Sequence, residues 1–199
     1  NIILSIGEFR SRYLAQNIKS VNGKLIKINT INSKYEIISR GHRNVQGLLY
    51  DNDENYLLFT EHGPAGGDEI NLLDFDEQSL NNFGWPIASY GYHYSDKLDI
   101  SRKNKYPFLK SHSLYGFNEP LKYFTPSIGI SEIIKVDTKS YVFSCLACKS
   151  IFFFKLDEKN KLFELLKIEI GERIRDMVFK EKKIYLFLED TASIGIIEL

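Results

Sequence analysis

Cysteine, methionine and tryptophan are scarce in this sequence, and long apolar runs are absent. Its 199 residues include two Cys, one Met and one Trp, and the longest apolar stretches, such as 151–154, are far too short to cross a bilayer. Charge of one sign is not in excess, because 26 Lys and Arg residues balance 26 Asp and Glu residues. We therefore expect a soluble chain without a membrane span or a nucleic-acid partner. The 43% of hydrophobic residues predicts a packed globular interior.

The two cysteines, Cys145 and Cys148, form a C-x-x-C motif inside the apolar segment 141–148. A redox or metal role would need a helix N-terminus or a second pair of ligands, and neither accompanies the motif. The segment is typical of a buried strand, on which residues three apart point to opposite faces, so a disulfide would need a bulge or a turn. We expect two small core residues rather than a bridged pair.

Short apolar runs separated by polar turns indicate an all-β chain. Helical periodicity is weak, and the runs are bounded by clusters such as 51–55 and 157–161, which are rich in Asp, Asn, Glu and Lys. The clearest predicted strands are 25–28, 56–60, 141–146, 151–156, 162–168 and 184–188.

An internal repeat favours a β-propeller. A strand, a polar turn and a strand opened by Tyr recur at Tyr56, Tyr141 and Tyr185, at spacings of 85 and 44 residues. A four-stranded blade needs about 40–50 residues, so the spacing of 44 fits one blade. The spacing of 85 is either two blades or one blade with a long insertion. We favour the insertion, because 90–125 shows no clean pair of strands. An irregular β-sandwich is the alternative fold.

The chain is too short for most closed propellers. At this blade size it holds about three to four blades, whereas closed rings have about four to eight. It also begins inside an apparent strand, at Asn1-Ile2-Ile3-Leu4. We therefore expect one domain over 1–199 that forms the C-terminal part of a larger ring, with N-terminal blades absent or supplied by another chain.

Polar clusters stand at the starts or ends of repeated strands. The segment 39–47 contains two Arg, a His, an Asn and a Gln, and 61–69 combines glycines with carboxylates, whose oxygens suit Ca²⁺. Arg173 and Arg175, in 172–176, are two residues apart and would face the same way on a strand. Each cluster could be an ordinary turn or surface charge, but in a propeller such ends converge around the central channel. Together they indicate a cofactor site.

The order of these motifs closely resembles the glucose/sorbosone dehydrogenase family, which includes soluble quinoprotein glucose dehydrogenases and aldose sugar dehydrogenases. The resemblance extends over essentially the whole chain and implies a six-bladed propeller, of which this chain would supply the second half or slightly more. The motifs that carry it are RGHRNVQGL (40–48), EHGPAGGDEIN (61–71), NFGWP (82–86), YGYHY (90–94), TPSI (125–128) and RIRD (173–176).

The resemblance implies a cofactor, pyrroloquinoline quinone (PQQ), together with Ca²⁺. PQQ carries three carboxylates and an ortho-quinone, so it needs cations and a Lewis acid. The residues that match family contacts to PQQ are Arg43, Asn44, Ser127, Lys149, Arg173 and Arg175. The carbonyls of Gly63 and Pro64 would hold the Ca²⁺ that polarises the quinone. Glu69 and the carbonyl of Phe83 resemble a second, structural Ca²⁺ site.

In the family mechanism a His general base takes the proton of the sugar C1 hydroxyl while hydride passes to PQQ. That His belongs to the family's N-terminal half, so we expect it upstream of this chain and assign no catalytic residue here. The four histidines that do not match it are His42, His62, His93 and His112. The chain also departs from the family pattern at Glu8, Val45 and Phe83.

The resemblance therefore implies PQQ- and calcium-dependent oxidation of the C1 hydroxyl of aldoses to lactones, with an external electron acceptor. We expect this chain alone to be inactive without the catalytic His. The alternatives are a non-catalytic binding module of the same family and a Ca²⁺-dependent lactonase. Arg43 and the arginine pair argue against the former, and a carbonyl loop in place of a carboxylate cage argues against the latter. Family members are generally periplasmic or secreted. The sugar, the acceptor and the oligomeric state, a homodimer included, stay open.

Overall fold

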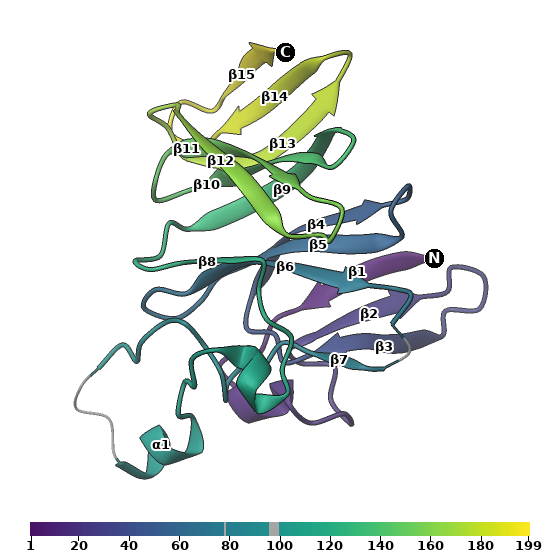
Figure 1. The fold of residues 1–199 in the computed structure, drawn as a ribbon, viewed down its shortest axis with the longest axis vertical. Helices are drawn as coiled ribbons and strands as arrows, with labels where there is room; N and C mark the ends of the chain where they lie inside the picture. Colours follow the sequence, from purple (N-terminus) through teal and green to yellow (C-terminus); the bar gives the residue numbers. More distant parts are fainter. Residues whose placement is uncertain (78, 96–99) are drawn as a thin grey trace.

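The computed structural model describes residues 1–77, 79–95 and 100–199, and within them the strands form four sheets (Figure 1). The first sheet has the order β1 (Ile2–Ile6), β2 (Lys24–Ile28), β3 (Tyr35–Arg40) and β7 (Asn81–Asn82). The second has β4 (Val45–Asp51), β5 (Tyr56–Glu61), β6 (Asp68–Asp74) and β8 (Lys122–Phe124). The third has β9 (Ile130–Asp137), β10 (Ser140–Cys145), β11 (Ser150–Leu156) and β12 (Leu162–Glu169). The fourth has β13 (Ile174–Lys180), β14 (Lys183–Leu188) and β15 (Ser193–Glu198).

The four sheets stack face to face as an arc of propeller blades (Figure 1). Sequential strands pair antiparallel within each sheet, apart from the short parallel pair of β3 and β7. The first strands of the second, third and fourth sheets lie beside one another, since β9 contacts both β4 and β13. The starts of these strands are therefore brought together along one line, as the propeller interpretation requires. No helix in the described part of the chain is both long and apolar enough to cross a membrane.

The tyrosine repeat is confirmed. Tyr56, Tyr141 and Tyr185 lie in β5, β10 and β14, the second strands of three consecutive sheets. The spacing of 85 residues is therefore one blade with an insertion. That insertion separates β6 from β8 and contains β7, the helix α1 (Ile100–Lys105) and the 3-10 helix η2 (His112–Tyr115). A further 3-10 helix, η1 (Arg12–Ala15), lies between β1 and β2.

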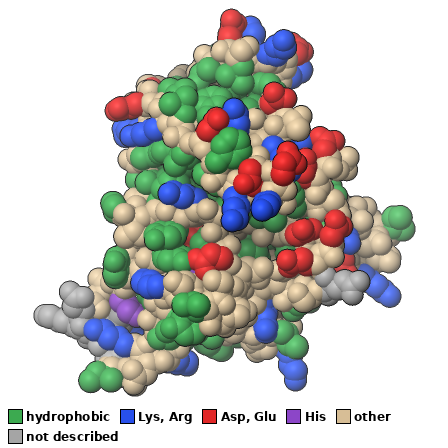
Figure 2. All heavy atoms as spheres, in the orientation of Figure 1, with side chains coloured by type: hydrophobic (Ala, Val, Ile, Leu, Met, Phe, Trp, Pro, Cys, Tyr) green, Lys and Arg blue, Asp and Glu red, His purple; other side chains and the backbone are tan. Residues whose placement is uncertain are grey.

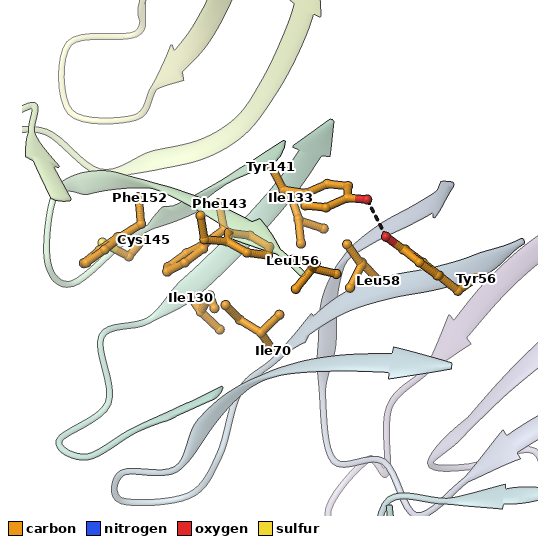
Figure 3. Close-up of a cluster of buried hydrophobic side chains, with 11 residues drawn as sticks. Tyr56, Leu58, Ile70, Ile130, Ile133, Tyr141, Phe143, Cys145, Phe152 and Leu156 are labelled. Carbon is orange, nitrogen blue, oxygen red and sulfur yellow. Dashed lines mark hydrogen bonds between the residues drawn. The ribbon is translucent and has the colours of Figure 1, made fainter. Parts of the chain in front are cut away.

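Apolar side chains fill the spaces between neighbouring sheets. The largest cluster lies between the second and third sheets and contains Leu58, Ile133 and Phe143, all buried (Figure 3). At its edge the hydroxyls of Tyr56 and Tyr141 are 2.5 Å apart. Separate clusters join the first sheet to the second and the third to the fourth. Each sheet is thus held by its neighbours, which is how a propeller buries apolar area without one central core.

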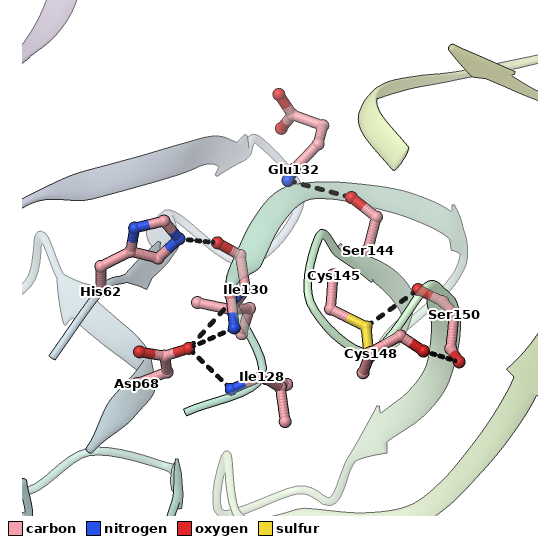
Figure 4. The surroundings of a disulfide bond; sticks show 10 residues. His62, Asp68, Ile128, Ile130, Glu132, Ser144, Cys145, Cys148 and Ser150 are labelled. Atoms are coloured by element: carbon pink, nitrogen blue, oxygen red, sulfur yellow. Dashed lines mark hydrogen bonds between the residues drawn. A yellow bond between two sulfur atoms is a disulfide. The ribbon is translucent and has the colours of Figure 1, made fainter. Parts of the chain in front are cut away.

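The expectation that the cysteines are unbridged is wrong. Cys145 and Cys148 form a disulfide, with Cα atoms 5.6 Å apart (Figure 4). β10 ends at Cys145 and the chain turns before β11 begins at Ser150, so Cys148 is not on the strand that the apolar pattern predicted. The turn supplies the change of direction that a bridge between residues three apart requires.

Apolar side chains remain exposed on the third and fourth sheets, and Figure 2 shows hydrophobic side chains gathered over the upper part of that view. On the fourth sheet they lie beside one another on neighbouring strands. Val178 pairs with Tyr185, Tyr185 pairs with Ile196, and Phe187 pairs with Ile194. Ile194 and Ile196 are 59% and 57% exposed. The described residues therefore leave the outer face of this sheet uncovered.

Candidate functional site

The candidate site forms where three strands of two neighbouring blades meet. Arg43 and Asn44 directly precede β4, the loop 62–67 follows β5, and Ser127 lies just before β9. β4 and β5 are antiparallel neighbours, so the start of one lies beside the end of the other. The sheet geometry therefore brings together segments that are far apart in the sequence.

The guanidinium of Arg43 is held in place partly by the loop 62–67. Its Nη1 donates to the carbonyl of His62 at 3.0 Å and its Nη2 to the hydroxyl of Tyr94 at 3.1 Å. Its Cζ lies 5.6 Å from the ring centroid of Trp85, and its backbone N–H donates to the carboxylate of Glu61. A fixed, half-exposed guanidinium beside carbonyl groups is suited to binding a carboxylate.

The loop after β5 is shaped by backbone groups. A Cβ on Gly63 would collide with the carbonyl oxygens of Gly66 and Gly67, so only glycine allows these carbonyls to converge. Ser127 joins the loop to β9, because its Oγ accepts from Gly66 N–H at 3.0 Å and donates to the carbonyl of Pro64 at 3.3 Å. Pro64 keeps a second lone pair on that oxygen for a cation.

Asp68 is a site residue to which the sequence assigned no role. Its side chain is buried, and one oxygen accepts from Ile128, Gly129 and Ile130 N–H at 3.0, 2.7 and 3.2 Å (Figure 4). The other oxygen accepts from Gly63 N–H at 3.1 Å. Asp68 therefore links the loop 62–67 to the start of β9. Its position after two glycines is visible in the sequence, but its partners 60 or more residues away are not.

A cavity of about 10 Å³ lies under this loop, lined by residues that include Arg43, Gly63, Glu69 and Phe83. That volume is about what one water or ion requires. The structure therefore brings both predicted metal sites to the borders of one small space. Pro64 does not line it.

Two buried carboxylates, Glu61 and Glu69, face this cavity. Burial, and next the charge of Glu61, hold the pKa of Glu69 well above its usual range. One Glu69 oxygen accepts from Asn71 Nδ2 at 3.2 Å, and the nearest histidine nitrogen, His112 Nε2, is 3.9 Å from the other. A Ca²⁺ ion would offset this repulsion and takes oxygen ligands, so the donor set fits.

Carbonyl oxygens are essential to that fit. Within the described ranges, no group of three or more His, Cys, Asp or Glu side chains is placed to hold a metal. Calcium bound here would therefore need backbone oxygens, and the predicted carbonyl ligands that border the cavity are those of Gly63 and Phe83.

The remaining predicted cofactor residues lie on the third and fourth sheets and hold carboxylates of this chain. Arg173 Nε and Arg175 Nη2 both donate to Glu189, at 3.3 and 2.9 Å, so the two arginines do face the same way. Lys149 Nζ pairs with Asp190 at 2.8 Å. These cations are partly exposed. They are not in contact with Arg43, but each already pairs with a carboxylate of this chain.

His42 and His93 have structural contacts. His42 is 1% exposed; its Nδ1 donates to Glu61 at 3.1 Å and its Nε2 accepts from Ser39 Oγ at 2.7 Å. His93 stacks on Phe108 with ring centroids 4.0 Å apart.

The other two histidines line the cavity. His62 Nε2 donates to the carbonyl of Ile130 at 2.6 Å, and its Nδ1 lies 3.4 Å from Asn44 Nδ2. His112 is 1% exposed, and burial lowers its pKa. The Nε2 of His62 is therefore engaged by a backbone carbonyl, whereas neither ring nitrogen of the buried His112 has a hydrogen-bond partner among the described residues.

The chain resembles known proteins over almost its whole length. Residues 1–197 match the model of the glucose / sorbosone dehydrogenase family. Aldose sugar dehydrogenase YliI of Escherichia coli is 32% identical over 143 residues, which are 65% of this chain and 36% of that protein. Quinoprotein glucose dehydrogenase B of Acinetobacter calcoaceticus is 38% identical over 73 residues, which are 34% of this chain and 14% of that protein.

A crystal structure of a glucose dehydrogenase superposes on 98% of this chain with a TM-score of 0.79 and 26% identity. The match covers 59% of that protein, so the chain spans less than two thirds of its length. The predicted all-β propeller architecture is confirmed.

Proposed function

Because the chain belongs to the glucose/sorbosone dehydrogenase family, we propose that it forms the PQQ- and calcium-binding part of an enzyme that oxidises the C1 hydroxyl of aldose sugars to lactones. The observation that carries the proposal is the meeting of Arg43, the Gly63–Pro64 loop and Ser127 at one place, beside a cavity lined by two buried carboxylates. The printed names of the aldose and quinoprotein relatives support the substrate class and the cofactor.

Each residue has a separate task in this proposal. Arg43 would bind a carboxylate of PQQ, with its orientation fixed by the His62 carbonyl, and Asn44 would add a polar contact. Gly63 and Pro64 would hold Ca²⁺ through carbonyl oxygens, and Ser127 keeps the Pro64 carbonyl in place. When bound, PQQ would accept hydride from the sugar C1.

The arginine pair would add positive charge from the fourth blade. Arg173 and Arg175 share Glu189, and surface ion pairs of this kind are weak. Replacing the Glu189 carboxylate by a cofactor carboxylate as the partner of the two arginines would therefore cost little free energy. Lys149, now paired with Asp190, would act in the same way.

We infer that proton removal needs a base from outside this chain. His42 is buried in hydrogen bonds to Ser39 and Glu61, and His62 is bonded to the carbonyl of Ile130. We therefore expect the chain to bind PQQ without turning over sugar. The disulfide supports an oxidising compartment such as the periplasm, with an external electron acceptor.

The test combines thermal unfolding with two activity assays. PQQ and Ca²⁺ together are expected to raise Tm more than either alone, because bound ligands stabilise the folded state. Glu69→Gln should remove the effect of Ca²⁺, whereas Glu164→Gln, at an exposed ion pair on β12, should keep it.

Neither dye-linked aldose oxidation nor lactone hydrolysis by the chain alone is expected. Calcium-dependent lactone hydrolysis without PQQ would identify a lactonase instead, and dye reduction by the chain alone would show that it contains the base.

A further inference from the structure

A second, positively charged pocket lies beside the candidate site. The segment around η1 and the helix α1 border an open pocket of about 470 Å³, lined by Arg10, Arg12, Arg102 and Lys105 together with two tyrosines. Four cations on two segments that are distant in the sequence therefore surround one space.

The described carboxylates do not pair with the cations of this pocket. Within the described part of the chain, none of the four cations forms an ion pair with Asp or Glu. Burial first, and then the charge of Arg102, lower the pKa of Arg12, while the charge of Glu8 raises it. Arg43 adds a further repulsion. Among the described groups, the repulsion of Arg12 by Arg102 and Arg43 thus outweighs its attraction to Glu8.

Three aromatic rings surround the guanidinium of Arg12, and one of its nitrogens has no hydrogen-bond partner. Its Cζ lies 5.2, 5.8 and 5.8 Å from the ring centroids of Trp85, Tyr106 and Phe108, so three aromatic rings fix the guanidinium. Its Nη1 is buried without a hydrogen-bond acceptor. A buried donor without an acceptor is costly, and a bound anion would satisfy it.

We propose that this pocket binds an oxyanion, a phosphate or carboxylate group carried by a small molecule. Arg12 and Arg102 supply forked N–H donors that match such a group, and Lys105 supplies a point charge. The ring of Trp85 is contacted by Arg12 and Arg43, so the pocket adjoins the candidate PQQ site. The assignment does not depend on PQQ, because the residues that line the pocket, Arg12 included, are not those assigned to the cofactor.

The test is a calorimetric titration of the full chain with inorganic phosphate at constant ionic strength. Saturable binding of one phosphate is expected, weakened at least about tenfold by Arg12→Gln, since a charge-assisted hydrogen bond contributes about 1.5–3 kcal/mol. Arg102→Gln changes an exposed side chain of α1 and should weaken binding without unfolding the chain. Lys159→Gln removes an exposed charge in the β11–β12 turn and should leave the affinity unchanged.

Two further titrations identify the source of the anion. Glucose 6-phosphate binding more tightly than phosphate would assign the pocket to a phosphorylated sugar, and glucuronate binding more tightly would assign it to an acidic sugar. Equal affinity for all three would assign it to the free oxyanion. The proposal is overturned if a folded chain shows no saturable binding of any of them, or if Arg12→Gln and Arg102→Gln bind as tightly as the unchanged chain. Either result would leave the proposed PQQ site untouched.

Discussion

At the scale of single residues, Lys24 is a buried charge that holds a backbone segment near the site through hydrogen bonds. The side chain is fully buried, and its Nζ donates to the carbonyls of Leu14, Ala15 and Asn22 at 2.8, 2.9 and 2.8 Å. Burial, and next the charge of Arg40, lower its pKa to about 8, so it stays largely charged at neutral pH. The ammonium fixes the segment that also carries Arg12.

Lys24→Met is therefore expected to lower the free energy of unfolding by about 3 kcal/mol, because three carbonyls lose a charged donor. Urea unfolding measures the change. Lys27→Met is the matched control on the same strand. Lys27 is half-exposed and its ion pair among the described residues is with Glu36, so a loss below about 1 kcal/mol is expected. Equal losses in the two variants would contradict the assigned role of Lys24.

Glu132, on β9, gives a prediction for pH. Burial, and next the charge of Asp176 on β13, raise its pKa from 4.5 to about 7. Between about pH 5 and 7 the folded chain then holds a proton that the unfolded chain has lost, so the contribution of Glu132 to stability falls as pH rises and is constant above that window.

The measurement is the urea midpoint at several pH values between about 5 and 8. Glu132→Gln should remove this part of the pH dependence, and Glu158→Gln, whose side chain is 96% exposed, should not. A Glu132→Gln profile parallel to that of the unchanged chain would show that Glu132 does not titrate in this range.

At the scale of elements, the second and third blades are joined by a buried polar contact. The hydroxyl of Tyr141 donates to Asp51 at 2.7 Å and meets that of Tyr56 at 2.5 Å. Lys135 Nζ donates to the same Asp51 carboxylate at 2.7 Å. Tyr141→Phe should cost about 2 kcal/mol in unfolding free energy, because Asp51 and Tyr56 lose a buried partner.

Tyr185→Phe is the control for this prediction. Tyr185 occupies the equivalent place in β14, and the described residues offer its hydroxyl no hydrogen-bond partner, so a change within about 0.5 kcal/mol is expected. If both variants lose the same free energy, the hydroxyl network does not join the blades.

The fold was largely predictable because strand periodicity and turn residues are local. The Tyr repeat correctly placed three second strands, and the insertion followed from the missing strand pattern in 90–125. The disulfide was not predictable, since an apolar run does not reveal that the chain turns after Cys145. The partners of Asp68 and Lys24 were also hidden, because they are backbone groups fixed only by the packing of distant segments.

At the scale of the whole molecule, the chain presents an arc of four sheets with its polar groups at the starts and ends of strands. Arg43 and the loop 62–67 lie between the second and third blades, whereas Arg173, Arg175 and Lys149 belong to the third and fourth. The motif order predicted both sets. It could not predict that the second set pairs with Glu189 and Asp190, since those contacts depend on the local turn geometry.

The most direct test of the account is an absorbance titration of the chain with PQQ, in Ca²⁺ and in a chelator. We predict saturable binding only with Ca²⁺, weakened at least about tenfold by Arg43→Gln, which removes a charge-assisted contact, and unchanged by Lys159→Gln. A well-folded chain that binds no PQQ in Ca²⁺, or that binds it equally well after Arg43→Gln, would contradict the claim that these loops form a quinone site.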